Sequence, residues 1–561
     1  MPARRVAAPL MGLLGVMVAA CGDSAPPGTG GGADGGGGSQ IELPPPLDPI
    51  EPVAPTDTER FRASGACNQC HLANDGVLMR DPTTGEDLSP GGQWRASMMA
   101  LAARDPFYLA VLSEQLELSD DVEAVEAICI RCHAPAGSEE ASEAGVHLGL
   151  EELLAGDSAA ANLGRDGVTC SLCHQISESN LGEIESFTGG FEVGFGRQMF
   201  GPHEGPRTDP MQFFVEYTPT YSEHINSSEL CATCHTVIIP VVEGGEHVGD
   251  FVEQAPYFEW LNSSLGSTPC RTCHLPVVDA TGAALATPIA TYPEALPTRE
   301  PFGVHSFEGA NAYMLTMLSE NVEWTGADVS AGELQAAAAR SLRHLETAAT
   351  LDVSASSTAG GHEVAVLVEN QTAHKLPTGY PGRRLWLHVI AKDSAGSTVF
   401  ESGGWNERGE IVDGGGESME PGAAMFPHVD EVTSEAQVAL WESVPGDWAG
   451  EPTYVPLAAV AYVKDNRILP SGWEDDGPYT DWTHPVGTSS DVSFGPGRDQ
   501  VRFTVPSSSA TVVVELVYQT MPPGQRDHLA RVATPAAVRF TQMAEGVSPE
   551  PLVIARVEQP L

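Results

Sequence analysis

Five copies of the pentapeptide Cys-x-x-Cys-His occur in the first half of the chain. This is the sequence to which c-type haem is attached. Two thiols three residues apart lie on one side of a helical turn, so both can form thioethers with the two vinyl groups of one porphyrin. The histidine that follows can bind the iron from the proximal side. The sequence therefore predicts five covalently bound haem c groups. The attachment residues are Cys67, Cys70 and His71; Cys129, Cys132 and His133; Cys170, Cys173 and His174; Cys231, Cys234 and His235; and Cys270, Cys273 and His274.

Structural zinc, a redox-active cysteine pair and a disulfide framework are the alternative interpretations of these cysteines. Structural zinc takes four ligands, and five Cys-x-x-Cys pairs cannot be divided evenly among such sites. A redox-active pair needs no histidine after its second cysteine, and a disulfide framework gives no reason for identical spacing. Ten of the 11 cysteines lie in the motifs and the other is Cys21, so no thiol remains for a structural disulfide.

The distal axial ligands determine whether such a chain carries electrons or binds a substrate. An iron with two protein ligands is closed, whereas an iron with an open distal face can bind a small molecule. Candidate distal ligands in the haem region are His224, His305, His203, His147 and His247. His344 and His374 are further candidates, and Met98 or Met99 could serve one iron. The alternative is a surface or hydrogen-bonded position for each histidine, and helix packing for each methionine.

The composition is that of an acidic globular chain. Its 561 residues suffice for two or three domains. Asp and Glu number 76 against 28 Lys and Arg, which gives a formal charge of −48. Such a chain should not bind nucleic acid or an anionic membrane surface through its side chains. Redox protein partners with basic docking surfaces are compatible with this charge, and a solvated acidic shell is the simpler interpretation.

Residues 1–21 have the features of a bacterial lipoprotein signal peptide. Two arginines precede an apolar stretch, 6–20, that is too short for a comfortable membrane span. It ends in Val-Ala-Ala-Cys21, which resembles a lipobox, in which the cysteine becomes the lipidated first residue. An ordinary cleaved signal is the alternative. Both predict export, which haem attachment also needs, and Gly22 favours a lipid anchor in the outer membrane, facing the periplasm or the cell surface.

The chain that follows divides into a tether, a haem region and a connecting helix. Residues 22–57 are rich in glycine and proline and should hold a folded body away from the membrane. Residues 58–325 contain the motifs, with short helices such as 94–116 and 120–131 between long irregular loops. Because little polypeptide separates the motifs, we expect porphyrin to supply much of the buried apolar surface. Residues 326–350 contain a helix, 331–349, that joins two domains.

Residues 351–545 are predicted to be all-β, with a sandwich as the architecture. The expected strands alternate apolar with polar side chains, and turn clusters separate them. They are 362–369, 383–391, 397–401, 456–463, 500–505 and 511–519, of which the last two should form a hairpin. Residues 546–561 are a loose tail or an edge strand. The predicted fold class is multidomain: a mainly α-helical and irregular haem domain, followed by an all-β, sandwich-like domain.

Weak internal similarity suggests a duplication. It aligns Gly145, His147, Gly149, Asn162 and the third motif with Gly245, His247, Gly249, Asn262 and the fifth motif, without a gap. Coincidence is the alternative. If the duplication is real, His147 and His247 hold equivalent positions.

In its five haem-attachment motifs and in several segments around them, the chain resembles the multihaem cytochrome c superfamily. Within it, the resemblance is to the branch that includes the tetrahaem electron acceptors of hydroxylamine oxidation. The matching features are Trp94-x-x-Ser97-Met98, Gly167-Val-Thr-Cys170, Ser228-Glu-Leu-Cys231, Glu259-Trp260-x-x-Ser263, and His305-x-Phe307 with Asn311. The segment Asn370-x-x-x-His374-Lys-Leu-Pro377-Thr-Gly379-Tyr-Pro381-x-Arg383-Arg384-x-Trp386 resembles the β-domain that follows the haem region in exported bacterial multihaem cytochromes. The resemblance implies a multihaem cytochrome c domain followed by a β-domain.

Two segments of the β-rich region contain further residues that could bind haem or a metal ion. His374 could lie at the domain junction as a ligand or beside one, and Arg383 or Arg384 could pair with a haem propionate. The alternative is turn chemistry that leads into a strand. Asp465 and the residues up to Gly472, with the two aspartates that follow, could bind Ca²⁺; a solvated loop is the alternative.

Three functions fit these features. The first is a pentahaem electron-transfer lipoprotein of the bacterial envelope, with a β-domain that docks a partner. The second is a multihaem oxidoreductase that acts on a small nitrogen or sulfur species at one open haem. No motif carries the Cys-x-x-Cys-Lys change of nitrite reductases, and the histidines are numerous enough to close every iron. The third is a non-redox surface protein that works through its β-domain. We expect an electron carrier rather than a catalyst.

Overall fold

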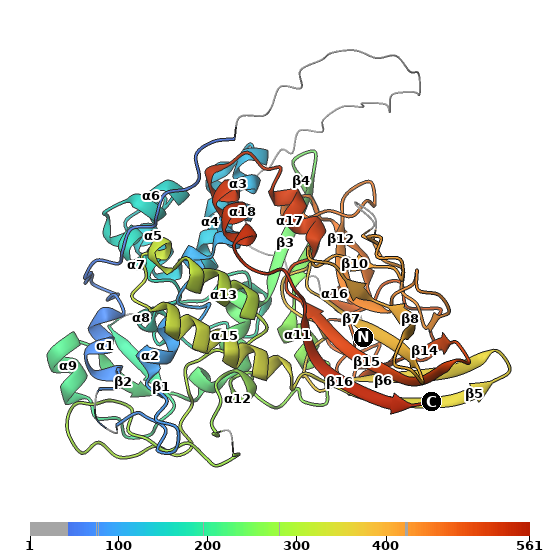
Figure 1. Ribbon diagram of the computed structural model, residues 1–561. Coiled ribbons are helices and arrows are strands. Elements are labelled where there is room, and N and C mark those ends of the chain that lie inside the picture. Colours follow the sequence, from blue (N-terminus) through green and yellow to red (C-terminus); the bar gives the residue numbers. More distant parts are fainter. Residues whose placement is uncertain (1–42, 75, 77, 195, 280, 421–424) are drawn as a thin grey trace, which may run out of the picture.

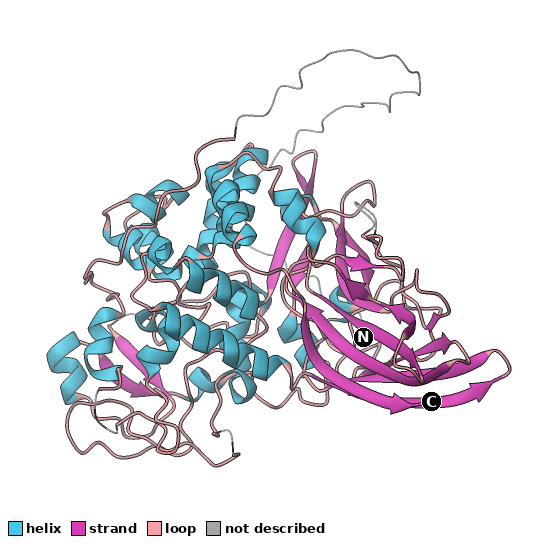
Figure 2. Cartoon of the chain, viewed as in Figure 1, coloured by secondary structure: helices cyan, strands magenta, loops and turns pink. Residues whose placement is uncertain are grey.

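The computed structural model describes residues 43–74, 76, 78–194, 196–279, 281–420 and 425–561. The predicted signal peptide, with Cys21, lies outside these residues, as does most of the predicted tether. A helical part carries the motifs and a β part follows it, and the two lie side by side (Figures 1 and 2). Among the described residues, no helix has both the length and the apolar character needed to span a bilayer.

Short helices separated by long loops make up the helical part, as the sequence predicts. Each motif lies in a helix or at its end, namely in α1, α4, α8, α10 and α12. The helices are α1 (Gly65–His71), α2 (Pro90–Arg95), α3 (Pro106–Leu118), α4 (Val122–His133), α5 (Pro135–Glu143), α6 (Leu150–Ala155), α7 (Ala159–Arg165), α8 (Cys170–Cys173), α9 (Asp209–Val215), α10 (Ser228–His235), α11 (Pro256–Leu261), α12 (Arg271–His274), α13 (Ala312–Glu320) and α14 (Val322–Thr325).

The single helix predicted over 94–116 is wrong. Helix α2 ends at Arg95 and α3 begins only at Pro106. Proline fits the first turn of a helix but has no N–H to continue one. The Asp105 side chain accepts a hydrogen bond from the Phe107 N–H (2.9 Å) and so caps α3. The buried Arg104 holds the break in place, because its guanidinium donates to the Arg165 carbonyl (2.8 Å).

Two strand pairs lie within the helical part. Strands β1 (Gln198–Gly201) and β2 (Thr218–Tyr221) pair in parallel. Strands β3 (Val237–Glu243) and β4 (Glu246–Gln254) form an antiparallel hairpin directly after α10. The far end of β4 touches the β part, where the Tyr462 hydroxyl donates to the Glu253 carbonyl (2.7 Å).

The β part consists mainly of two sheets that pack face to face, the sandwich-like arrangement that the strand pattern predicts. One sheet has the order β11-β14-β6-β5, and the other has the order β13-β12-β7-β15-β16 with β8 added to β7. Alternate valines and leucines of β6, β7, β14 and β15 fill the space between the sheets. The strands are β5 (Ala349–Thr358), β6 (Gly361–Asn370), β7 (Arg384–Asp393), β8 (Thr398–Ser402), β11 (Glu431–Val432), β12 (Leu440–Gly446), β13 (Ala461–Asp465), β14 (Arg498–Val505), β15 (Ser509–Gln519) and β16 (Leu552–Pro560). A short ladder of β9 (Gly404–Trp405) and β10 (Ile411–Val412) lies beside them.

The predicted hairpin of 500–505 and 511–519 is wrong. Strand β14 pairs with β6 and β11, whereas β15 pairs with β7 and β16 in the other sheet. Both edges of β15 are therefore occupied, so the short link between β14 and β15 crosses from one sheet to the other. Sequence alternation cannot separate these cases, because adjacent strands of a hairpin and of a sandwich corner bury the same face.

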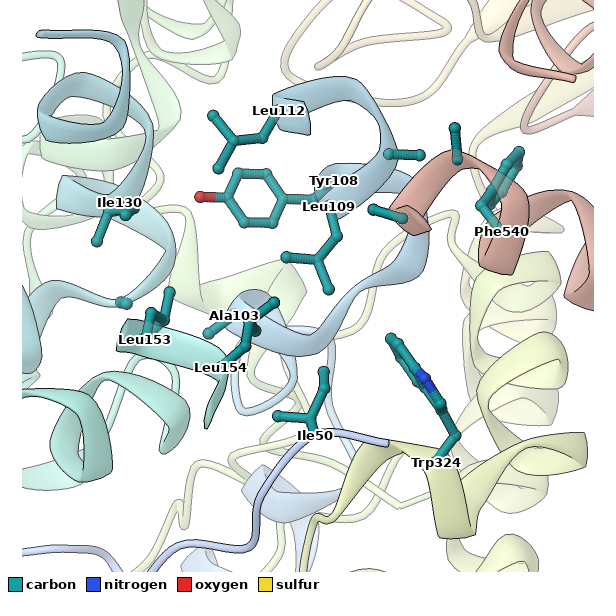
Figure 3. Close-up of a cluster of buried hydrophobic side chains, with 14 of the residues drawn as sticks. Ile50, Ala103, Tyr108, Leu109, Leu112, Ile130, Leu153, Leu154, Trp324 and Phe540 are labelled. Atoms are coloured by element: carbon teal, nitrogen blue, oxygen red, sulfur yellow. The ribbon is translucent and has the colours of Figure 1, made fainter. Parts of the chain in front are cut away.

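The end of the chain differs from the predicted all-β region, whereas the edge strand, one of the two alternatives for residues 546–561, is present. Helices α17 (Pro523–Leu529) and α18 (Pro535–Glu545) interrupt the strands, and β16 is an edge strand on β15. Helix α18 packs against α3 of the helical part, with Phe540 in the apolar cluster that Figure 3 shows. The C-terminal segment thus contributes to the cores of both parts.

The predicted connecting helix is present as α15 (Ala331–Leu345). The Ser330 and Glu333 side chains form a capping box at its start. It packs along α13 rather than standing free between the parts. Its last turn carries His344.

Candidate functional site

All fifteen motif residues line one cavity. It has a volume of about 1910 Å³ and lies where the helical part meets the β part. Pockets for drug-sized ligands measure roughly 300–1,000 Å³, so this space is large enough for more than one such molecule. Leu376, Arg383 and Tyr518 are among its walls on the β side. The structure therefore brings all five motifs together around a single interior.

The motif histidines are oriented as metal ligands. In four of them Nδ1 donates to a backbone carbonyl, which leaves Nε2 as the nitrogen with the free lone pair. Burial lowers the pKa of both His133 and His235 to about 4 and so keeps these rings neutral. The four hydrogen bonds are His71 to Ile289 (2.7 Å), His133 to Ala102 (3.0 Å), His174 to Phe200 (2.6 Å) and His274 to Glu308 (2.5 Å).

The motif cysteines are free thiols that approach one another between motifs rather than within them. The Cys170 and Cys67 thiols lie within interaction distance of each other, as do those of Cys132 and Cys234 and those of Cys231 and Cys270. The third and fourth motifs are also neighbours, since Cys173 and Cys234 interact electrostatically. The five attachment points therefore form one connected, branched group, with the first motif beside the third and the fourth motif beside the second, third and fifth.

Two distal histidines stand opposite motif histidines at the spacing of shared metal ligation. The ring centroids of His174 and His305 are 6.3 Å apart with 21° between the planes, and those of His274 and His374 are 6.4 Å apart with 18° between the planes. A metal–imidazole bond of about 2.0–2.1 Å puts two rings on one ion with centroids roughly 6 Å apart. His344 also lies near His274, at 5.4 Å, and His203 lines the cavity.

Three predicted distal ligands lie away from the cavity wall. His147 Nε2 bonds to Glu126 (2.7 Å), and the exposed His247 bonds to Asp250 (2.9 Å). Both nitrogens of His224 are engaged, Nε2 with the Ile176 carbonyl (2.8 Å) and Nδ1 with the Ser222 hydroxyl (2.6 Å). The structure thus brings His203 and His305 to the cavity, together with His344 and His374, but not these three. Met98 and Met99 line the cavity as well.

The predicted equivalence of His147 and His247 is wrong. His147 lies in a loop between α5 and α6, whereas His247 lies within strand β4. The similarity around them therefore does not reflect a repeated structure.

Four arginines on the cavity wall have no acidic partner among the described residues: Arg207, Arg271, Arg299 and Arg383. The Nε atoms of Arg271 and Arg299 are buried and make no hydrogen bond there. Arg383 donates only to the Thr378 carbonyl and the Asn311 amide oxygen. Haem propionates are carboxylates that would satisfy such guanidinium groups. Arg384, the other predicted propionate partner, is turned into the β part and pairs with Glu420 (2.7 Å).

Buried charges join the two parts beside His374. Glu259 of α11 is fully buried, pairs with Arg467 (3.0 Å) and accepts from the Lys375 N–H (3.0 Å). Asp465 in turn pairs with Arg467 (2.8 Å) and with Lys375 (2.6 Å). Neither the calcium site nor the solvated loop predicted from Asp465 onward is present at this aspartate, because its carboxylate is buried and neutralised by two cations.

The residues present fit covalently attached haem c. Unpaired thiols, neutral imidazoles with a free Nε2, and arginines without acidic partners all face one largely apolar interior. Haem bound there would supply reversible one-electron iron chemistry.

Comparisons with known proteins give one similar structure. No family model matches the chain, and no curated protein matches it. The crystal structure of a penta-heme cytochrome c552 from Thermochromatium tepidum superposes with a TM-score of 0.51 at 18% sequence identity. The alignment covers 91% of this chain and 100% of that one. The chain therefore shares the fold of a multihaem cytochrome c across both of its parts.

Proposed function

We propose that this chain is an exported pentahaem c-type cytochrome that transfers electrons between redox partners in the bacterial envelope. The observation that carries the proposal is the gathering of all five motifs around one cavity, with a thiol of each motif close to a thiol of another motif. Sites this close permit electrons to pass from one to the next. The fold shared with a penta-heme cytochrome supports the same function.

The chain's own residues would hold the haems in a fixed order and keep water out. The cysteines would form ten thioethers, and the motif histidines would bind the five irons. His305 and His374 would close the irons of the third and fifth motifs. Arg271, Arg299 and Arg383 would pair with propionates and offset their charge, which matters in a chain of net charge −48.

The same charge favours partners with basic docking surfaces. Export and a lipid anchor at Cys21, in the outer membrane, remain part of this proposal on the strength of residues 1–21 alone.

Stopped-flow electron transfer tests the proposal. The reduced holoprotein is mixed with a basic monohaem cytochrome and, as a control, with an acidic one. We expect all five haems to be oxidised by the basic partner, at a rate that falls steeply with ionic strength. Slow, salt-independent transfer to both partners would contradict an electron-carrier role.

A further inference from the structure

Exposed aromatic side chains gather on and beside α9, at the edge of the helical part that is turned away from the β part (Figure 1). Phe213 and Phe214 are adjacent on this helix and are 81% and 53% exposed. Their rings meet edge to face, with centroids 4.9 Å apart. Phe214 makes the same kind of contact, at 5.5 Å, with Tyr292, which is 50% exposed. We call Phe213, Phe214 and Tyr292 the α9 patch.

The α9 patch does not serve as the core of a local fold. Helix α9 has no buried residue, so its two phenylalanines contribute little to folding where they stand. Single exposed apolar residues are ordinary, whereas exposed apolar side chains in contact with one another are typical of a binding surface. Aromatic residues are also enriched at the centres of protein interfaces.

The α9 patch borders the first motif. The N–H and the hydroxyl of Thr291, the residue before Tyr292, both donate to the Cys70 carbonyl, at 2.8 and 3.1 Å. Phe214 and Tyr292 also line the large cavity. These two rings therefore have the cavity on one side and solvent on the other, next to the attachment site of one haem.

The first motif is one end of the group of attachment sites. Among the described thiols, those of Cys67 and Cys70 approach no motif other than the third, through Cys170. The fourth motif, in contrast, lies beside three others. Electron transfer between two proteins needs their cofactors close together, so an end of the group that lies behind an exposed patch is suited to it.

Acidic groups surround the α9 patch. The two segments that carry it, 202–216 and 291–300, contain five acidic residues against two arginines, of which only Arg207 is exposed. Glu216 is paired with Arg62 and Arg197, and the other four acidic groups form no ion pair within the described residues. All five are exposed: Glu204, Asp209, Glu216, Glu294 and Glu300.

This arrangement of charge selects the occupant. An apolar centre inside a polar rim is the usual organisation of a protein interface. A second copy of this chain would bring its own acidic rim against this one, and like charges at an interface are unfavourable. The same charge disfavours nucleic acid and anionic lipid. A basic protein with an apolar centre matches both the rim and the aromatic rings.

We propose that the α9 patch is the docking surface for a small basic redox protein, which exchanges electrons with this chain at the first motif. One electron passes in each encounter: the iron held by the first motif is oxidised from ferrous to ferric, and the cofactor of the partner is reduced. The inference rests on the proposed function and names the surface and the haem that this function uses.

The aromatic centre is tested with Phe213→Ser in the haem-loaded full chain. The reduced protein is mixed with a basic monohaem cytochrome in a stopped-flow instrument, and the second-order rate constant is measured. We expect this constant to fall by roughly fivefold or more, because it depends on the affinity of docking, to which central aromatic residues contribute most. Trp448→Ser is the matched control, since Trp448 is 57% exposed in the turn after β12, and it should leave the constant unchanged.

The acidic rim is tested with a pair of substitutions. Asp209→Asn combined with Glu294→Gln should lower the rate constant at low ionic strength and flatten its dependence on salt. Asp352→Asn combined with Glu363→Gln removes the same charge from exposed positions on β5 and β6 and should change neither. Haem content and midpoint potentials are measured on every variant, so that a loss of docking is separated from a change in driving force.

The outcomes separate this inference from the proposed function. A wild type that transfers electrons to the basic cytochrome, with Phe213→Ser and the rim variant equally fast, would leave the proposed function standing and overturn the docking surface. A wild type that transfers none would overturn both. Sedimentation velocity checks the remaining occupant: a dimer of the wild type that Phe213→Ser dissociates would show that a second copy covers the α9 patch, which would also overturn the inference.

Discussion

The imidazole rings of His274 and His374 face each other at 6.4 Å, although His274 belongs to the fifth motif and His374 to the β part. The His374 Nδ1 donates to the Lys375 carbonyl (3.0 Å), which leaves its Nε2 for a metal. Lys375 itself is held by Asp465 and Glu259. The β part therefore completes a site in the helical part, and buried charges keep it in place.

Removing a distal imidazole should leave one haem iron without its second axial ligand. We expect His374→Ala and His305→Ala each to convert one low-spin haem to high spin in the electron paramagnetic resonance spectrum of the oxidised protein. His247→Ala is the control, since His247 is exposed on β4, and it should change nothing. Unchanged spectra for both cavity variants would remove these histidines from the ligand set.

Breaking the buried charge network should destabilise the whole chain. Asp465→Asn leaves Lys375 and Arg467 short of a negative partner in a site that solvent does not reach. Losing one partner of a buried ion pair costs about 3–5 kcal/mol. Thermal unfolding of the holoprotein should show this loss, while Asp430→Asn, at a half-exposed pair with Arg502, should change stability by less than about 1 kcal/mol. Equal effects of the two variants would contradict a special role for the junction.

Because of Asp465, the folding stability of the protein should decrease at acid pH. Burial alone would raise the pKa of Asp465, but Arg467 and Lys375 outweigh burial and lower it to about 2. An unfolded aspartate has a pKa of about 3.9. Its contribution is therefore present above that value and is lost as the pH falls toward 2. The melting temperature should fall more steeply between pH 4 and 2 in the wild type than in Asp465→Asn; parallel profiles would exclude this contribution.

The positive charge of Arg383 should raise the reduction potential of the nearest haem. Replacing it by glutamine removes a positive charge from the cavity wall, which makes reduction of the nearest iron less favourable. We expect one midpoint in a spectroelectrochemical titration to fall by on the order of tens of millivolts. Arg498→Gln, at an exposed position on β14, should leave all midpoints in place. A titration curve of Arg383→Gln that overlays the wild type would show that no haem lies beside this arginine.

The local chemistry of the chain was predictable from its sequence, because a Cys-x-x-Cys-His motif needs only one helical turn to position its side chains. The same holds for the strands of the β part and for the helix around Ser330, where alternation and capping are local signals. The helix and most of the predicted strands are present in the structure where the sequence predicts them. The strand predicted over 456–463 is wrong in its first half, because Pro456–Ala458 form a 3-10 turn and β13 begins only at Ala461.

Long-range relationships were not predictable in this way. The position of His374 opposite His274 depends on how the helical part and the β part pack together. The sequence around either residue gives no signal for this contact. His224 precedes a motif closely, yet a backbone carbonyl occupies its Nε2. The pairing of β14 and β15 with different strands likewise depends on tertiary contacts. The one local clue to the junction was the run of signature residues around His374.

A count of the haems tests covalent haem attachment at the five motifs most directly. The full chain, produced with cytochrome-maturation machinery, is assayed as pyridine haemochrome in alkaline solution, and its intact mass is measured in parallel. Five covalently attached haems per chain are expected, lost one at a time when the cysteine pair of a single motif is changed to alanine. Four or fewer in the fully matured protein, or a folded and colourless product, would contradict the claim that haem fills the cavity at the centre of this molecule.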